Sequence, residues 1–492
     1  MARDVVRFVR RGQIVERRDF APTETLLDHL RLRERAFGTK EGCAEGDCGA
    51  CTVAVGRLRG GRLAYEPVNS CIQLVGMLDG TEVVAVDDLA PSSDDLHPVQ
   101  RALVDAHASQ CGFCTPGFVM TLFTLYHAGV RADRTTVNDW LAGNLCRCTG
   151  YRPISDAALA CCTGEAKDAW ASRAAATADR LAAIADGADL FAGDENAFFA
   201  APATEDELAA IAARYPDATI VGGATDVGLW ITKQLRELPR IVHTGRVASL
   251  HEVREHEDRV EIGAAATYAE AERALAAIDP DIGEMLRRLG SKQVRAAGTI
   301  GGNIANGSPI GDSPPVLIAL GASIELRLGD TRRTLPLEDF FLDYGRQDRS
   351  PGEVLTRIVV PRLGSGEHFR CYKISKRFDQ DISALLGAFR LAVEGGRVVA
   401  ARIAYGGMAA TPKRATRAER AATGLALDRP ASWSAAAEAL AADFTPIDDH
   451  RASADYRLRV ARSLLLKALT EIAGRPTGET RVVGARERSA AA

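Results

Sequence analysis

Hydrophobic and polar positions alternate at the start of the chain and then change period. Residues 5–9 and 13–20 alternate on either side of Arg11-Gly12, which predicts a β-hairpin. The next segment, TETLLDHLRLRERA, places its leucines at helical spacing. LAYEPVNSCIQLVGMLDGTEVVAV then returns to strand-like runs. A hairpin, a helix and further strands within roughly 80–90 residues suit a small sheet packed on one helix, which is an ordinary domain size.

From residue 95 the pattern becomes helical. Four short segments, VQRALVDAHAS, PGFVMTLFTLYHAG, TVNDWLAGNL and ISDAALACC, predict two antiparallel helix pairs in a small bundle. Thr115-Pro116 is typical of an N-cap followed by a proline in the first helical turn. Residues 164–195 are rich in alanine with scattered charge, which predicts a partly helical linker.

The second half alternates strands, glycine turns and helices. ATIVGGATDVGLWITKQL predicts strand, turn and helix, and RAAGTIGGNIANGSPIGDSPPVLIALGA predicts a glycine-rich loop that enters an apolar segment. LLGAFRLAVEG and RVVAARIAYGG flank Gly395-Gly396 and predict a second hairpin. Helices are expected around 434–442 and 455–473, and the tail ETRVVGARERSAAA is expected to be loose.

Composition and charge exclude several classes of protein. The chain is 46% hydrophobic and 26% charged, and with a net charge of −4 and no basic stripe we expect no nucleic-acid partner. The chain contains no run of about eighteen apolar residues, so we expect no membrane-spanning helix. The first twenty residues are too charged for a secretory signal. We therefore expect a cytoplasmic protein whose thiols stay reduced or bind metal.

Ten of the eleven cysteines precede residue 163. In the first group four residues separate Cys43 from Cys48, two separate Cys48 from Cys51, and nineteen more lead to Cys71. This is the spacing of a plant-type [2Fe–2S] site. Three glycines let the loop curl so that its amides point inward: Gly42, which precedes Cys43, and Gly46 and Gly49 between the cysteines. A zinc site of four cysteines is the alternative, although the paired spacing that zinc prefers is not met.

The second group consists of Cys111 and Cys114 in QCGFCTPGF and of Cys146 and Cys148 in GNLCRCTGYRPI. A disulfide between Cys146 and Cys148 would close a tiny ring and fit disulfide geometry badly. The Cys-x-x-Cys pair alone also matches a redox dithiol. Each pair precedes a predicted helix, whose dipole and free N–H groups stabilise thiolates, so we expect four ligands of a second cluster. The remaining thiols, to which we assign no function beyond packing, are Cys161, Cys162 and Cys371.

Two glycine-rich segments in the second half are candidate ligand loops. IVGGATDVG, residues 220–228, follows a predicted strand and opens a helix, so its amides suit a pyrophosphate. It lacks the Gly-x-Gly-x-x-Gly fingerprint, so a nicotinamide Rossmann site is not supported, and a plain tight turn fits as well. GTIGGNIANGSPIGD, residues 298–312, lets a flat, phosphorylated ligand approach the backbone, or is an ordinary surface loop.

Together, EGCAEGDCGACTV, QCGFCTPGF and GNLCRCTGYRPI resemble the signature of the xanthine oxidase (molybdenum hydroxylase) family, in all eight cysteines and their glycines. The resemblance implies an α+β multidomain fold. It consists of a β-grasp ferredoxin-like domain, a four-helix [2Fe–2S] bundle, a two-part α/β FAD-binding domain of the PCMH/VAO type and a C-terminal α+β flavoprotein domain. The expected bounds, in that order with a linker and a tail, are 1–86, 87–163, 164–195, 196–370, 371–480 and 481–492.

The same resemblance implies FAD contacts in the second half. The residues expected to wrap the pyrophosphate are Ile220, Val221, Gly222, Gly223, Ala224, Thr225, Asp226 and Val227. Those expected to hold phosphate, ribitol and ring edges are Thr299, Gly302, Asn303 and Asp312, with further flavin positions at Leu289, Leu355 and Lys373. Leu289 departs from the animal members, which carry a stacking aromatic there. Tyr344 matches a position near the nicotinamide docking face, and residues 376–383 resemble the loop that tunes dehydrogenase against oxidase behaviour.

By resemblance, the chain is the iron–sulfur/FAD subunit of a bacterial-type xanthine dehydrogenase and has no catalytic residue of its own. The molybdopterin domains have no room here, so molybdopterin is expected on a large partner subunit, in a heterotetramer with two copies of each. Electrons from hypoxanthine or xanthine would pass through two clusters to FAD and NAD⁺. The alternatives are a subunit of another molybdenum hydroxylase (for aldehydes, nicotinate or an aromatic acyl-CoA), a free-standing NAD(P)H-dependent ferredoxin reductase and a non-enzymatic, zinc-stabilised module.

Overall fold

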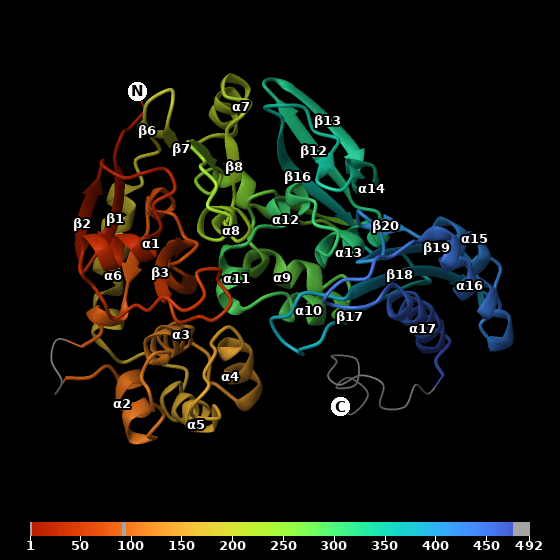
Figure 1. Cartoon of the computed structure of the whole chain (residues 1–492), viewed down its shortest axis with the longest axis horizontal. Helices are drawn as coiled ribbons and strands as arrows, with labels where there is room; N and C mark the ends of the chain where they lie inside the picture. The colour runs from red at the N-terminus through yellow and green to blue at the C-terminus, as the bar shows by residue number, and fades with distance from the viewer. Residues whose placement is uncertain (1, 91–94, 476–492) are drawn as a thin grey trace. The chain divides into compact units, whose positions relative to one another are not determined.

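The computed structural model describes residues 2–90 and 95–475, which form two compact units (Figure 1). The first unit comprises residues 1–248 together with 290–298, and the second comprises 249–289 and the chain from 299 onward. The tail expected at 481–492 lies outside the described residues. Within the two described stretches, no helix has both the length and the apolar character needed to cross a membrane.

The first unit begins with a five-stranded sheet. Its strands, in the order β2-β1-β5-β3-β4, are Gln13–Arg17, Val6–Arg10, Glu82–Val84, Thr52–Arg59 and Arg62–Asn69. Arg11 (φ 52°) and Gly12 (φ 72°) take the left-handed conformations of a tight hairpin turn, which confirms the predicted hairpin. Leu26 of α1 (Leu26–Asp28) and Leu30 in the π-helical turn that follows pack on inward-facing side chains of the sheet.

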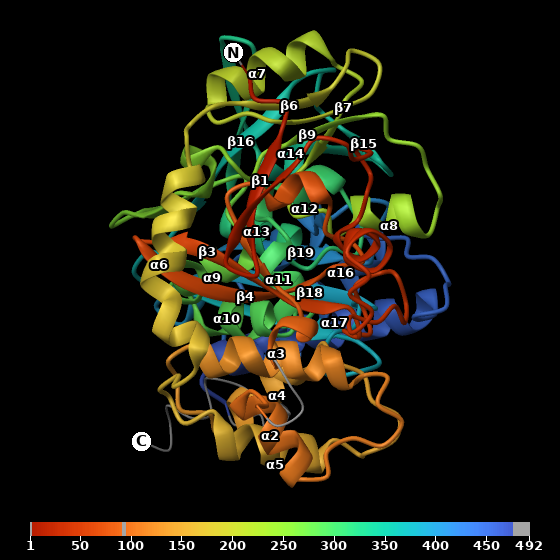
Figure 2. The same cartoon turned by 90° about the vertical axis from the view of Figure 1, so that its left-hand side faces the viewer.

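The four predicted short helices are present. They are α2 (Pro98–Asp105), α3 (Thr115–His127), α4 (Arg134–Leu141) and α5 (Arg152–Cys161), and they share one apolar core. Cys114, not Thr115, is the N-cap of α3, so the predicted cap is wrong by one residue. The alanine-rich segment forms α6 (Ala169–Ile184), which lies along the first sheet (Figure 2) and buries Leu181 and Ile184 against Val9.

A second, four-stranded sheet completes the first unit. In the order β6-β7-β9-β8 its strands are Leu190–Gly193, Phe198–Ala201, Arg240–His243 and Thr219–Val221. The helices near this sheet are α7 (Glu205–Arg214) and α8 (Val227–Thr232). The first unit also contains the later α11 (Lys292–Ala297), which packs on β4 of the first sheet. The predicted strand, turn and helix around residues 219–232 are therefore confirmed.

The second unit contains a five-stranded sheet with the order β10-β11-β16-β12-β13. These strands are Val253–Glu255, Arg259–Gly263, Val354–Pro361, Ser323–Leu328 and Thr331–Pro336. The accompanying elements are α9 (Tyr268–Ala276), α10 (Pro280–Arg287), α12 (Ile300–Asn306), α13 (Ser313–Leu320), α14 (Leu337–Phe340), β14 (Phe341–Asp343) and β15 (Arg346–Gln347). The glycine-rich loop predicted at 298–312 is wrong in part, because the Thr299 hydroxyl accepts the Gly302 amide at 3.0 Å and caps a helix.

The C-terminal part of the second unit packs helices on a four-stranded sheet, β17-β18-β19-β20. The strands are Glu367–Ile374, Leu385–Glu394, Arg397–Gly406 and Lys413–Arg414. The helices are α15 (Thr416–Ala422), α16 (Ser434–Asp443) and α17 (Ala454–Ile472). The hairpin predicted at Gly395-Gly396 and both C-terminal helices are confirmed. Helices and strands mixed in several domains are the α+β class that was expected.

Candidate functional site

The first cysteine loop leads into β3, and Cys71 follows β4. Ala44 (φ 55°), Gly46 (φ 77°) and Gly49 (φ 68°) are left-handed. A Cβ at Gly49 would lie 2.2 Å from the carbonyl oxygen of Gly143, so only glycine fits at that position. The repeated left-handed residues curl the loop, and its amides can therefore point toward its own sulfurs.

Several hydrogen-bond donors converge on the Cys43 sulfur. The Cys48 amide donates to Cys43 Sγ at 3.3 Å. The Cys48 thiol and then three backbone amides, those of Cys48, Glu45 and Asp47, lower the pKa of Cys43 to about 5, although burial raises it. Donors gathered around a sulfur stabilise its anionic form, which is the form that binds iron.

The other two thiols of this group form a second pair, and each is only 2% exposed. The Cys71 thiol donates to the Cys51 sulfur and lowers the pKa of Cys51, although burial raises it. The Gly46 amide points at Cys71, and Asn69 fixes this part of the loop by donating to the Gly46 carbonyl at 2.9 Å. Four sulfurs surrounded by inward amides fit a [2Fe–2S] cluster.

The second group of cysteines also forms two pairs. Cys114 interacts with Cys146, and Cys111 with Cys148. Burial, and then the hydrogen bond to Cys146, raises the pKa of Cys114 to about 12. The Cys146 sulfur accepts the amides of Cys148 and Thr149, both at 3.5 Å. This sulfur is buried, whereas Cys111 and Cys148 are exposed. The donors again suit a cluster bound by thiolates.

The two cysteine loops contact each other within the first unit. The Leu145 amide donates to the Cys48 carbonyl at 3.0 Å, and the Asn144 side chain donates to the Gly49 carbonyl at 3.2 Å. The approach is close because glycines face each other. A Cβ at Gly117 would lie 2.1 Å from the Gly49 oxygen. One hydrogen bond therefore joins a ligand candidate of the first group, Cys48, to the residue before a ligand candidate of the second, Cys146.

The end of α8 holds the first cysteine loop from outside. The Thr232 hydroxyl donates to the Ala44 carbonyl, and the Lys233 ammonium donates to the Cys43 carbonyl, each at 2.6 Å. The peptide group that contains the Ala44 carbonyl also contains the Glu45 amide, which points at the Cys43 sulfur. Sequence reasoning missed both residues, because nothing in their local pattern marks a contact with a loop about 190 positions earlier.

The residues predicted to wrap a pyrophosphate lie in the first unit. β8 ends at Val221, a turn follows, and α8 begins at Val227. Ala224 takes a left-handed conformation (φ 58°). A Cβ at Gly223 would lie 1.7 Å from the Ala297 carbonyl oxygen, so this turn packs directly against the end of α11. The turn therefore places the backbone of Gly223 in direct contact with the backbone of α11.

The flavin-contact residues predicted at 299–312, 355 and 373 lie in the second unit. Asp312 is 7% exposed, pairs with the Lys373 ammonium and accepts the Ser383 hydroxyl at 2.5 Å. Asn303 accepts the Ser313 hydroxyl at 2.8 Å. Leu355 lies in β16 and packs in the core. The structure therefore joins two predicted residues in a buried ion pair, and it adds Ser383, the last residue of the predicted loop 376–383, as a hydrogen-bond partner of Asp312.

The remaining predicted positions of the second unit differ in exposure. Leu289 packs against the apolar core, whereas Tyr344 is 73% exposed in the turn between β14 and β15. The segment 376–383 is held by Arg288. Its guanidinium donates to the Phe378 carbonyl at 3.0 Å and lies 4.5 Å from the centre of that ring. Arg288 was not predicted, since its contact lies 90 residues away along the chain.

A buried triad of His97, Asp168 and His127 links α6 to the helical bundle. Both histidines lie at hydrogen-bond distance from Asp168, with their Nε2 atoms 2.5 and 2.9 Å from Oδ2. His97 Nδ1 accepts the Val99 amide at 3.2 Å, so its proton lies on Nε2 and is donated to the carboxylate. The triad has the residue types of a metal site. In this tautomer, however, the Nε2 atom of His97 carries a proton and donates it to Asp168, so the triad is a structural hydrogen-bond network.

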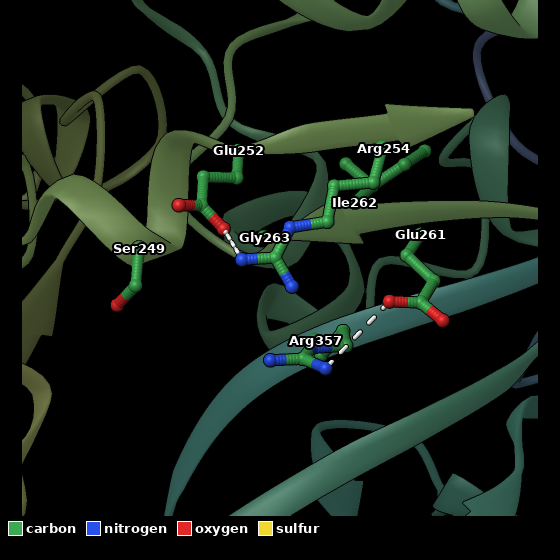
Figure 3. Close-up of a pocket in the computed structure, with 7 residues that line it drawn as sticks. All are labelled: Ser249, Glu252, Arg254, Glu261, Ile262, Gly263 and Arg357. Atoms are coloured by element: carbon green, nitrogen blue, oxygen red, sulfur yellow. Dashed lines mark ion pairs between the residues drawn. The ribbon is translucent and has the colours of Figure 1, made fainter. Parts of the chain in front are cut away.

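A small polar pocket in the second unit contains none of the predicted site residues (Figure 3). Its charged side chains are paired, Arg254 with Glu252 and Arg357 with Glu261, the latter at 3.7 Å. Since each guanidinium already has a carboxylate partner, this pocket is poorly suited to an anion. The cysteine loops and the glycine-rich segments remain the candidate site.

Comparison with known families assigns three regions. Residues 85–159 match a [2Fe-2S] binding domain. Residues 194–363 match the FAD binding domain in molybdopterin dehydrogenase. Residues 370–472 match the CO dehydrogenase flavoprotein C-terminal domain. These matches support [2Fe–2S] and FAD as the cofactors of the chain.

Among curated proteins, the chain is similar to xanthine dehydrogenase from Drosophila subobscura, at 33% identity over 85% of this chain and 35% of the relative. Xanthine dehydrogenase/oxidase from Mus musculus is 32% identical over 82% of this chain and 34% of its own length. The chain thus spans about a third of the length of the curated relatives that it matches.

Two solved structures resemble slightly more than half of the chain. Carbon monoxide dehydrogenase from Hydrogenophaga pseudoflava aligns at 29% identity and a TM-score of 0.53, covering 55% of this chain and 95% of the matched chain. Quinoline 2-oxidoreductase from Pseudomonas putida 86 aligns at 26% identity and a TM-score of 0.52, covering 56% and 95%. With the three domain matches and the cysteine loops, these relatives show that the chain belongs to the molybdenum hydroxylase family and carries its [2Fe–2S] and FAD domains.

Proposed function

We propose that the chain is the iron–sulfur/FAD subunit of a xanthine dehydrogenase. It passes electrons from hypoxanthine or xanthine, oxidised at a molybdenum cofactor on a large partner subunit, to NAD⁺. The observation that carries the proposal is the pair of cysteine loops joined by the hydrogen bond from the Leu145 amide to the Cys48 carbonyl. When bound, the clusters carry single electrons and the flavin exchanges them as hydride with NAD⁺.

The proposal assigns ligands to each cofactor. The first cluster is held by Cys43, Cys48, Cys51 and Cys71, and the second by Cys111, Cys114, Cys146 and Cys148. FAD is contacted by residues 220–227 and by Leu289, Thr299, Gly302, Asn303, Asp312, Leu355 and Lys373. The proposed bounds of the domains and the linker are 1–86, 87–163, 164–195, 196–370 and 371–480.

The residues of this chain contribute binding and tuning. The amides around Cys43 and Cys146 stabilise thiolates, and hydrogen bonds to sulfur, together with solvent exposure, set the potentials of such clusters. The first group is the more buried, since Cys51 and Cys71 are each 2% exposed, whereas Cys111 and Cys148 are exposed. This difference suits the second cluster to receive electrons from the partner, in a heterotetramer with two copies of each subunit.

A second candidate is the same type of subunit in another molybdenum hydroxylase, for example one acting on an aldehyde, nicotinate or an aromatic acyl-CoA. The structural similarity to carbon monoxide dehydrogenase and quinoline 2-oxidoreductase favours keeping it. The partner subunit selects the substrate. Co-purified complex assayed with xanthine, an aldehyde and quinoline therefore separates the candidates. NADH formation with xanthine alone supports the first, and turnover of another substrate without xanthine activity contradicts it.

The acceptor is tested on the purified chain itself. Under anaerobic conditions, NADH is expected to bleach the flavin band and then to reduce both clusters. The Cys148→Ser variant serves as the control, because it keeps the flavin step and loses one cluster signal. A flavin that dithionite bleaches and NADH leaves unchanged would exclude NAD⁺ as the acceptor.

A further inference from the structure

Gln293 connects α11 to both cysteine loops. The side chain is 1% exposed and lies in the first unit, although its sequence falls within the region that matches the FAD-binding domain. Its Nε2 atom is 3.2 Å from the Thr52 hydroxyl oxygen, 3.1 Å from the Thr121 hydroxyl oxygen and 3.2 Å from Asn144 Oδ1. Thr52 follows a ligand candidate of the first group directly, and Thr121 lies in α3 of the helical bundle.

The acceptors in this network determine the direction in which each hydroxyl group donates its hydrogen bond. The Thr52 hydroxyl donates to the Gly49 carbonyl at 2.7 Å, and the Thr121 hydroxyl donates to Asn144 Oδ1 at 2.8 Å. Both hydroxyl oxygens are therefore available to accept, and the amide of Gln293 has two N–H groups to offer. Gln293 thus completes two chains of hydrogen bonds, one that ends on each cysteine loop.

Both chains end where the loops meet. Asn144 donates to the same Gly49 carbonyl at 3.2 Å, and the next residue, Leu145, donates to the Cys48 carbonyl at 3.0 Å. The other end of the Gln293 amide packs on Gly143, where a Cβ would come within 2.2 Å of Oε1. Among the described residues, Oε1 makes no hydrogen bond, so the contribution of the side chain is its two donors.

We propose that Gln293 is a positioning residue for electron transfer between the two clusters. Through Thr52 and Thr121 it fixes the positions of the Gly49 carbonyl and the Asn144 side chain. These two groups in turn keep the Leu145 amide at the Cys48 carbonyl. That contact connects the Cys48 carbonyl, through one hydrogen bond, to the residue that precedes Cys146. The inference rests on the proposed function, because it assumes a cluster at each set of cysteines.

The test uses the full chain loaded with iron and reduced with dithionite. Gln293→Met keeps the length of the side chain and removes both donors, and Gln293→Glu keeps the shape and has no N–H. Lys292→Met is the matched control, because it changes the neighbouring residue on the same helix. The ammonium of Lys292 lies 4.1 Å from the centre of the Trp140 ring. Two quantities are measured, which are the splitting of the EPR signals by coupling between the reduced clusters and the hydrogen exchange of the peptide around Leu145.

We expect both Gln293 variants to bind iron, to show altered splitting and to exchange the Leu145 amide at least tenfold faster, while Lys292→Met matches the wild type. Unchanged splitting and exchange in Gln293→Met and Gln293→Glu would overturn the inference. Hydrogen exchange reads the contact without reference to electron transfer. A wild-type chain without two [2Fe–2S] signals would contradict the proposed function, whatever hydrogen-exchange rate the variants show.

Discussion

Gly117→Ala tests the close approach of the two cysteine loops. The new Cβ would lie 2.1 Å from the Gly49 carbonyl oxygen, which must move by about 1.3 Å to reach an ordinary contact of 3.4 Å. That carbonyl is part of the backbone and cannot rotate away as a flexible side chain can. It also accepts the Thr52 hydroxyl at 2.7 Å and the Asn144 side chain at 3.2 Å, so a shift weakens both bonds.

The expected change in the free energy of unfolding combines one stabilising and two destabilising contributions. Alanine favours a helix over glycine by about 1 kcal/mol. Overpacking costs about 2–3 kcal/mol where the obstacle is backbone, and the two weakened hydrogen bonds cost about 1 kcal/mol each at most. We therefore expect the free energy of unfolding of the first unit to fall by about 1–4 kcal/mol, although intrinsic helix propensity alone predicts a gain.

The assay is urea unfolding of the purified chain followed by circular dichroism, with iron content measured alongside. Gly283→Ala in α10 is the control, because its Cβ would meet the Cβ and Cα of Ala276, at 2.9 and 3.7 Å, and no carbonyl oxygen. A Gly117→Ala chain as stable as the wild type, with full iron content, would refute the close packing of the two loops.

Three further predictions concern other parts of the chain. Cys148→Ser should abolish the EPR signal of one cluster and leave the flavin band intact; two full cluster signals would contradict the ligand assignment. Asp312→Ala should reduce FAD content after gel filtration, because the Lys373 ammonium would lose its buried carboxylate partner; full flavin content, with Asp330→Ala as an exposed control, would refute the role of Asp312. Burial raises the pKa of Asp168, but hydrogen bonds from His127 and His97 outweigh it and hold the pKa well below its usual range. The stability that the carboxylate contributes is therefore present above about pH 4 and lost as the pH falls further, so the advantage of the wild type over Asp168→Asn in urea should shrink on acidification; a constant difference from pH 7 to pH 3 would contradict this.

Local sequence patterns predicted the elements that local physics decides. Alternation around Arg11-Gly12 and Gly395-Gly396 gave both hairpins, because a turn and its flanking strands are neighbours in the chain. The cysteine spacings also predicted which thiols gather in two groups. The segment at 300–306 was misread as a loop, because its glycines disfavour a helix while the Thr299 cap and buried isoleucines favour one.

Contacts between distant residues were beyond local reasoning. Gln293 reaches Thr52 across 241 positions and Asn144 across 149. Nothing near residue 293 marks it as part of a cysteine-loop network. The Thr232 and Lys233 contacts with the first loop are of the same kind. Asp168 lies in what was predicted to be a linker, and only the folded bundle brings His97 and His127 to it.

The central claim is that this chain binds two [2Fe–2S] clusters at its cysteine loops and also binds FAD. The most direct measurement combines iron, zinc and flavin content with low-temperature EPR of the purified chain, before and after reduction with dithionite. Four irons and one FAD per chain, with two distinct signals after reduction, are the predicted result. Zinc in place of iron, with no flavin, from cells grown with ample iron would contradict the account and leave a structural module.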